Sequence, residues 1–169
     1  MGTGIARRVV WLGALVLSGC ASHGTLPPET RHAELAREQV EAAKAYADGD
    51  IPRAASLYED LVAALPDDAD LWYRLGNARF RLQDVDDAVT AYSRAAQIDP
   101  HHAKALYNLG VARLKQAQVA MLSSARASQP GDPLRRDGVR VAQRLARAGD
   151  DMDATGHLEG GAPPSIVEP

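Results

Sequence analysis

The chain has 169 residues, of which 46% are apolar and 24% charged, a composition typical of a globular protein with one modest core. Aromatic residues make up only 5% of the chain, which together with abundant alanine favours closely packed helices over sheets. The formal net charge of −3 leaves no overall basic surface for nucleic acid, and a single cysteine excludes an internal disulfide, a zinc ribbon and a thiol redox pair.

The charge is unevenly distributed along the chain. Residues 29–99 hold 15 acidic and 8 basic side chains, whereas residues 100–149 hold 2 acidic and 9 basic ones. A nucleic-acid partner would have to bind the basic stretch alone, while the acidic remainder repels phosphate. We therefore expect no nucleic-acid partner.

The first 19 residues have the pattern of an export signal. Arg7 and Arg8 precede an uncharged, mostly apolar run over residues 9–17. As a helix this run would rise only about 14 Å, roughly half the apolar thickness of a bilayer, so it fits a signal peptide rather than a stable span. The sequence Leu17-Ser18-Gly19-Cys20 that follows resembles the lipobox of bacterial lipoproteins.

This resemblance implies that residues 1–19 are removed and that Cys20 carries lipid, including palmitate-type acyl chains. Two or three such chains would give a stable membrane anchor. Ala21 lacks the aspartate that retains such proteins at the inner membrane, which implies the periplasmic face of the outer membrane. The alternative is a plain secretory signal followed by an incidental free cysteine. Residues 20–30 are expected to form a polar, lipid-bearing tether.

Beyond the tether the chain repeats itself with a period of about 34 residues, a length that resembles the tetratricopeptide repeat. Ala54, Tyr58 and Pro66 recur as Ala88, Tyr92 and Pro100, and Leu75-Gly76 recurs as Leu109-Gly110. These residue types also resemble those of the tetratricopeptide family. The resemblance implies antiparallel helix pairs that stack into a right-handed all-α solenoid of about 2.5 repeats, closed by a C-terminal capping helix.

The middle copy of the repeat, over residues 69–102, is the most regular. Gly76 and Ala88 are small where the two helices of one pair should meet, and Pro100 should end the second helix. The third copy begins well at Ala103 but has no glycine–aspartate turn near residue 117. We therefore expect its first helix to continue past that point.

The patterns predict six helices, over 31–47, 51–64, 69–81, 85–97, 102–126 and 133–148, within a domain spanning residues 31–149. Asp50, Asp84 and Asp132 are expected to cap helices, and Gly149 to end the last one. This last helix should dock on the third repeat through Leu134, Val141 and Leu145. Its arginines, on a different side, would either lie in solvent or meet anionic lipid or an acidic partner. Residues 150–169 are expected to be a disordered tail.

The sequence contains no pattern of catalytic residues, so we expect a protein that is not an enzyme and binds neither cofactor nor metal. The five histidines are scattered, and no metal-ligand or phosphate-loop spacing occurs. The acidic clusters at 84–87 and 150–153 lack the glycine and distal glutamate of a calcium loop.

The tetratricopeptide resemblance instead implies a concave groove lined by the first helix of each pair. Its lining positions correspond here to Asp70, Tyr73, Arg74, Asn77 and Phe80 in the middle copy, and to Lys104, Tyr107, Asn108, Val111 and Leu114 in the third, with Tyr46 as a candidate from the first. Aromatic rings and amides on one face suit a peptide backbone. We predict that Tyr73, Asn77, Phe80, Tyr107 and Asn108 contact a partner.

The predicted function is a lipid-anchored scaffold that binds other proteins of the bacterial envelope and assists assembly of a machine such as a pilus or secretion system. The partner is expected to be a protein and not a small-molecule substrate, with contact to the membrane through Cys20. The alternative is an accessory regulator of a cell-wall or polysaccharide enzyme. Fold resemblance alone does not distinguish these roles.

Overall fold

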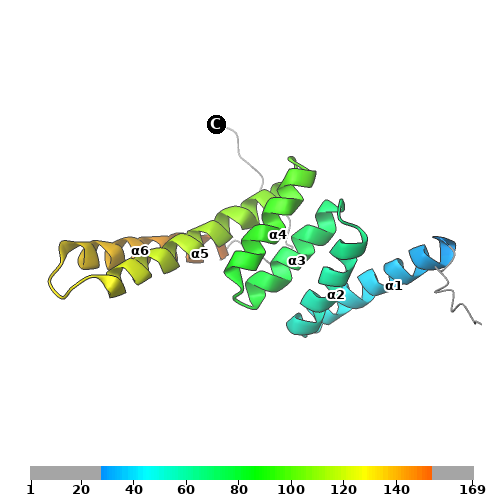
Figure 1. Cartoon of the computed structure of the whole chain (residues 1–169), viewed down its shortest axis with the longest axis horizontal. Coiled ribbons are helices and arrows are strands. Elements are labelled where there is room, and N and C mark those ends of the chain that lie inside the picture. The colour runs from blue at the N-terminus through cyan, green and yellow to red at the C-terminus, as the bar shows by residue number, and fades with distance from the viewer. Residues whose placement is uncertain (1–27, 154–169) are drawn as a thin grey trace, which may run out of the picture.

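The structure, a computed structural model, describes residues 28–153, and every regular element in that range is an α-helix. The helices follow one another along a stack from α1 to α4, and α5 and α6 form a longer hairpin that projects from its end (Figure 1). Their bounds are α1 (Pro28–Ala47), α2 (Ile51–Ala64), α3 (Ala69–Arg81), α4 (Val85–Ile98), α5 (Ala103–Ala127) and α6 (Pro133–Asp153). The predicted all-α architecture is confirmed.

The predicted helix boundaries agree closely with the structure except at the two ends. Helix α1 begins at Pro28, inside the segment predicted as a tether, since proline is well tolerated in the first turn. Helix α6 continues through Gly149 to Asp153, so the predicted stop at Gly149 is wrong. Gly149 does not take the left-handed backbone conformation that ends a helix, and the first four residues assigned to the tail are helical.

The turns inside the first two helix pairs are built alike. Gly49 and Gln83 occupy equivalent positions of successive repeats, and both have positive φ, at 84° and 65°. In each turn the N–H of the next residue bonds back to a carbonyl five residues earlier: Asp50 to Ala45 at 2.9 Å, and Asp84 to Arg79 at 3.0 Å. This arrangement satisfies carbonyls at the helix end and reverses the chain.

Acidic and imidazole side chains begin most of the helices. Asp50 accepts from the Arg53 N–H, as predicted, and Asp132 accepts from Leu134 at 2.8 Å. Asp84 stands at the start of α4 but makes no capping bond, because its carboxylate accepts from Arg79 at 3.1 Å. His102, which was not predicted as a cap, begins α5: its Nδ1 accepts from the Ala105 N–H at 3.2 Å.

Two buried clusters hold the stack together. The first joins α1, α2 and α3 around Tyr58 and Leu61, and the second joins α3, α4 and α5 around Tyr92. Trp72 packs against both clusters, and its indole N–H donates to the Pro66 carbonyl at 2.9 Å. Each large side chain buried in this way stabilises the fold by about 1.5–3 kcal/mol.

Helix α6 packs along α5 through small residues rather than through the predicted Leu134 and Val141. Gly138 and Ala142 are buried against α5, and a Cβ added at Gly138 would lie 2.9 Å from the Met121 carbonyl oxygen. Leu134 is 55% exposed, so the predicted contact there is wrong. Two helices can approach this closely only where the side chains between them are small. The predicted apolar residues of α6 gave no indication of such a contact.

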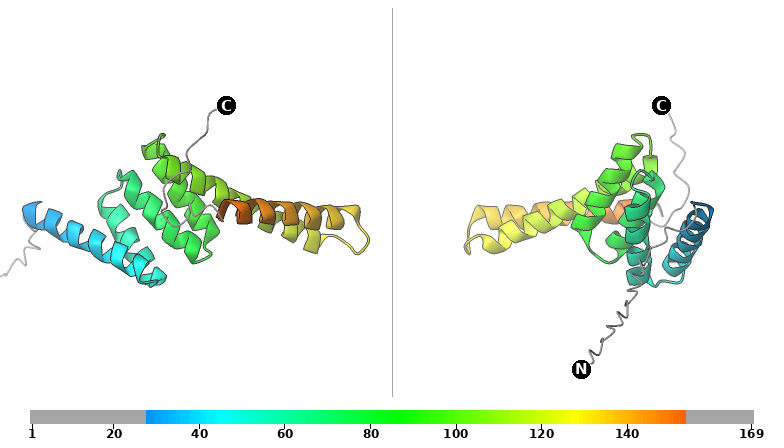
Figure 2. Two further views of the ribbon diagram at one scale, coloured as in Figure 1. Left: turned by 180° about the vertical axis from the view of Figure 1, so that it is seen from behind. Right: turned by 45° about the vertical axis from the view of Figure 1, so that its right-hand side comes forward.

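The α5–α6 hairpin extends away from the stack, as the views from two further directions show (Figure 2). The left-handed residue of its turn is Gly131, well beyond position 117, where the repeat spacing would place the counterpart of Gln83. None of the helices described between residues 28 and 153 is long and apolar enough to cross a membrane.

Candidate functional site

A hydrogen-bonded amide and phenol network joins the three helices under the predicted groove. Asn77 of α3 accepts on Oδ1 from the Tyr92 hydroxyl of α4 and from Nδ2 of Asn108 on α5, both at 2.9 Å. Burial raises the pKa of the Tyr92 hydroxyl above its ordinary value near 10, so this group remains a neutral donor. The network fixes the spacing of α3 and α5, whose exposed sides form the groove.

Two of the five predicted contact residues lie beneath the surface. Asn108 is 1% exposed and Tyr73 is 8% exposed, the latter packed against Tyr92 and His102 with ring centroids 6.2 and 5.0 Å away. Because both side chains are buried, the prediction that they contact a partner is wrong. Their positions in the repeat place both residues on the groove side of their helices. Packing against neighbouring side chains nevertheless buries them.

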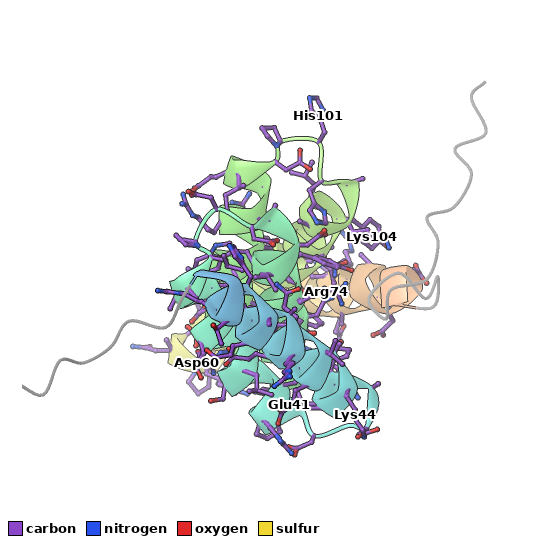
Figure 3. The ribbon with its side chains drawn as sticks, turned by 90° about the vertical axis from the view of Figure 1, so that its right-hand side faces the viewer. Glu41, Lys44, Asp60, Arg74, His101 and Lys104 are labelled. Atoms are coloured by element: carbon purple, nitrogen blue, oxygen red, sulfur yellow. The ribbon has the colours of Figure 1, made fainter. Side chains whose placement is uncertain are left out.

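Exposed cations lie on the same face as the remaining predicted residues. Asn77, Phe80 and Tyr107 are partly exposed, whereas Arg74 and Lys104 are exposed. Figure 3 shows Arg74 and Lys104 on the side of the stack where α6 lies, and Asp60 on the opposite side. We call the surface formed by Arg74, Asn77, Phe80, Lys104 and Tyr107 the groove face.

Helix α1 extends the groove face with an apolar patch that the sequence reading did not identify. Ala36, Arg37 and Val40 help to line an open hollow of about 500 Å³, and Val40 is 70% exposed. Val40 occupies the same position of the first repeat as Arg74 does of the second. The repeat spacing could therefore have found it, as it found Tyr46, over whose ring Arg81 lies at 5.0 Å.

Helix α6 borders the other end of the groove face. Its residues Leu145 and Gly149 share a hollow of about 160 Å³ with Phe80 of α3 and with Val111 and Leu114 of α5. Two predicted lining positions, Val111 and Leu114, are thus adjacent to α6. The groove is therefore short, running from α1 to the end of α6.

A larger hollow of about 600 Å³ lies at the turns between the pairs and is strongly acidic. Its carboxylates already act within the fold: they accept from Arg94 (Asp67), the Leu71 N–H (Asp68), His102 (Asp70) and the His101 N–H (Asp99). Within residues 28–153 no three His, Cys, Asp or Glu side chains are arranged to hold a metal ion. These carboxylates serve to start and connect helices.

Arg79 joins three helices through ion pairs. Its guanidinium donates to Glu59 of α2 and, at 3.1 Å, to Asp84 before α4, and it lies 3.9 Å from Asp87 of α4. The hydrogen bond to Glu59 raises the pKa of Arg79 further above neutral pH. These ion pairs connect α2, α3 and the start of α4 at one point.

The predicted lipidation residue Cys20 and the lipobox around it lie outside the described residues. The same is true of the predicted signal peptide and of the tail beyond residue 153. The anchor therefore stays a prediction from the sequence.

Comparison with known proteins identifies the repeat. The family model described as "Tetratricopeptide repeat" matches residues 40–103 and 77–133, which together cover more than half of the chain. Among curated proteins, the chain is 36% identical over 66 residues to the peroxisomal targeting signal receptor of Candida albicans, and 33% identical over 69 residues to that of Eremothecium gossypii. These segments are 39% and 41% of this chain but only 11% and 12% of the relatives, so the chain spans about a tenth of their length.

Proposed function

Since the chain belongs to the tetratricopeptide repeat family, whose repeats are generally non-catalytic scaffolds that bind proteins, we propose that its groove face binds a short segment of another protein. The observation that carries the proposal is the combination of a rigid floor and exposed cations. Asn77 is fixed by Tyr92 and Asn108, while Arg74 and Lys104 beside it are exposed. A prearranged surface loses little entropy on binding.

The segment is expected to carry a carboxylate. Within the described residues neither Arg74 nor Lys104 takes part in an ion pair, and arginine holds a carboxylate with two parallel hydrogen bonds. Tyr107 and Phe80 add partly exposed ring surface to the groove face. The fungal relatives are by name receptors of a targeting signal, which fits a short linear segment as the kind of partner.

The scaffold is further assigned to the periplasmic face of the bacterial outer membrane, held by lipid on Cys20. The support is the sequence Leu17-Ser18-Gly19-Cys20 after a short apolar run, followed by Ala21. There it would assist assembly of an envelope machine such as a pilus or secretion system. A short groove suits a transient contact. We expect a dissociation constant on the order of micromolar, which corresponds to a binding free energy of about 8 kcal/mol.

The test is a double variant of the groove face, Arg74→Ala with Tyr107→Ala, used in a crosslinking pull-down from membranes. We expect loss of the bound partner with unchanged helicity, since removal of central anchors costs about 2 kcal/mol or more. The matched control is Arg31→Ala with Leu134→Ala, which changes exposed residues away from this face. Retention of the partner by the groove variant would refute the groove assignment.

A further inference from the structure

Among residues 28–153, no helix makes the contact on α5 that α4 makes on α3 at Gly76. Gly76 and Gly110 occupy equivalent positions of successive repeats. A Cβ added at Gly76 would lie 2.5 Å from the ring of Tyr92 on α4, whereas a Cβ added at Gly110 would meet nothing within 4 Å among the described residues. In the part of the chain that the structure describes, the close helix contact made at Gly76 therefore has no counterpart at Gly110.

Helix α6 does not supply this contact, because none of its described residues lies within 4 Å of a Cβ placed at Gly110. It meets α5 beside Val111 and Leu114 and, farther along, at Ala125. The N-terminal half of α5 exposes residues spaced three, four and three apart, which therefore lie on one face. We call this the open face of α5; its residues are Ala103, Leu106, Gly110 and Arg113.

The open face is apolar at its centre and basic at one end. Leu106 is 45% exposed next to Gly110, which provides a flat surface for an approaching helix. Arg113 is the equivalent of Arg79 in the preceding repeat, and Arg79 pairs with Asp84 and Asp87 at the start of α4. Within residues 28–153, Arg113 forms no ion pair.

The α3–α4 pair shows what kind of helix fits such a face. Helix α4 begins with acidic residues that meet the arginine, and it then presents Ala88 and Tyr92, four residues apart, to α3. Tyr92 fills the space that Gly76 leaves. On α5 the equivalent glycine and arginine, Gly110 and Arg113, are both exposed.

We propose that the open face of α5 binds an amphipathic helix of another protein, which packs at Gly110 as α4 packs at Gly76. The partner helix carries acidic residues in its first turn, a small residue and, four positions later, a tyrosine. It binds beside α4 and away from the groove face, so that one molecule can hold two protein segments. Charge complementarity with Arg113 and the continuation of the α3–α4 interface determine this choice of partner.

The probe for this site is a labelled peptide with the sequence of residues 84–98, which is α4 itself with the aspartate that precedes it. We expect saturable binding to the full chain by fluorescence anisotropy. Gly110→Leu fills the surface needed by the tyrosine and should weaken binding at least tenfold, whereas Ala63→Leu, at an exposed position of α2, should leave it unchanged. Gly110→Leu should not disturb the fold, because nothing lies near that position.

A charge exchange tests the acidic end of the peptide. Arg113→Glu should weaken binding at least tenfold, and a peptide in which both Asp84 and Asp87 are replaced by arginine should regain affinity for that variant. Absence of saturable binding to the wild-type chain would overturn the proposal. So would binding that Gly110→Leu leaves intact, since the peptide would then be displacing the native α4 from α3.

These experiments test the groove face and the open face of α5 independently of each other. The groove variant Arg74→Ala with Tyr107→Ala should bind the α4 peptide with wild-type affinity, and Gly110→Leu should retain the partner captured by the groove. If the groove variant loses the peptide, the peptide binds the groove and the open-face proposal is wrong.

Discussion

The ring of Tyr92 determines how closely α3 and α4 approach each other. The sequence identified Gly76 as a close-contact position but assigned Ala88 as its partner, whereas the side chain that meets it is Tyr92. Spacing along a helix indicates which residues share a face, but it does not show which of their side chains contacts a given residue of the neighbouring helix. For the same reason, the burial of Asn108 and Tyr73 could not be predicted from the sequence.

Replacement of glycine by alanine should have opposite effects at the two equivalent positions. Gly76→Ala places a methyl group 2.5 Å from the Tyr92 ring and should lower the free energy of unfolding by about 1–3 kcal/mol. Gly110→Ala meets no neighbour and should raise it by up to about 1 kcal/mol, because alanine favours helix. Urea unfolding of both variants is the measurement, and equal shifts would contradict the close contact at Gly76.

The buried hydroxyl of Tyr92 should make stability fall at alkaline pH. Its pKa is raised by burial, so above about pH 10 the unfolded chain loses this proton while the folded chain keeps it. The free energy of unfolding should then decrease by about 1.4 kcal/mol per pH unit for this group alone. Tyr92→Phe should be less stable at neutral pH, through loss of the bond to Asn77, but should show a shallower alkaline decline. Parallel pH profiles of the two proteins would count against this origin of the decline.

At the scale of elements, helix positions were predictable from the sequence and helix contacts only in part. The repeat spacing, together with Asp50, Asp84 and Pro100, places α2, α3 and α4 within a residue of their observed bounds. The docking of α6 was misassigned because Leu134 and Val141 form an apolar stripe, while the contact depends on backbone approach at Gly138. The two short turns of the regular repeats are alike even though only one contains glycine.

Glycine at residue 83 should stabilise the turn between α3 and α4. Gln83 has a φ of 65°, a conformation that side chains with a Cβ disfavour by about 1–2 kcal/mol. Gln83→Gly should therefore raise the free energy of unfolding by about 1 kcal/mol, less the entropic cost of glycine in the unfolded chain. The reverse change at the equivalent turn, Gly49→Ala, should lower it. Thermal unfolding of both variants checks the prediction, which a destabilised Gln83→Gly protein would disprove.

Substitution of Gly138 should separate α6 from α5. Gly138→Leu forces a side chain against the Met121 carbonyl and should cost about 1–3 kcal/mol in the free energy of unfolding. The control is Leu134→Ala, which should change it by less than about 0.5 kcal/mol, because that side chain is exposed. Chemical unfolding of the pair distinguishes the two packing schemes: a large loss at Leu134 would restore the apolar-stripe interpretation.

At the scale of the whole molecule, the chain combines an acidic stack with a basic hairpin. Residues 29–99 carry a formal charge of −7 and residues 100–149 one of +7, and these ranges correspond largely to α1–α4 and to α5–α6. The arginines of α6 at 136, 140, 144 and 147 lie opposite buried Gly138 and Ala142. The sequence predicted this asymmetry directly, because charge needs no knowledge of packing.

Removal of the predicted lipid site should release the molecule from membranes. In cells, Cys20→Ser should abolish labelling by a clickable palmitate analogue and shift the protein from the membrane to the soluble fraction, because two or three acyl chains supply the anchoring. Gly19→Ala, which keeps a small residue beside the cysteine, is the matched control and should remain labelled. Unchanged labelling and fractionation of the Cys20→Ser protein would disprove the anchor.

The turn at Gly131 lies well beyond position 117, where the repeat spacing would place it. The α5–α6 hairpin therefore acts as a spacer whose length can change by whole helical turns. The difference corresponds to about 3.9 helical turns and to about 21 Å of rise, so the lengthened α5 keeps nearly the same orientation as a helix of ordinary repeat length. Insertion of seven residues into each of α5 and α6 would move the tip outward by about 10 Å and rotate it by only about 20°. The reach of the arm can therefore change independently of the repeats that support it.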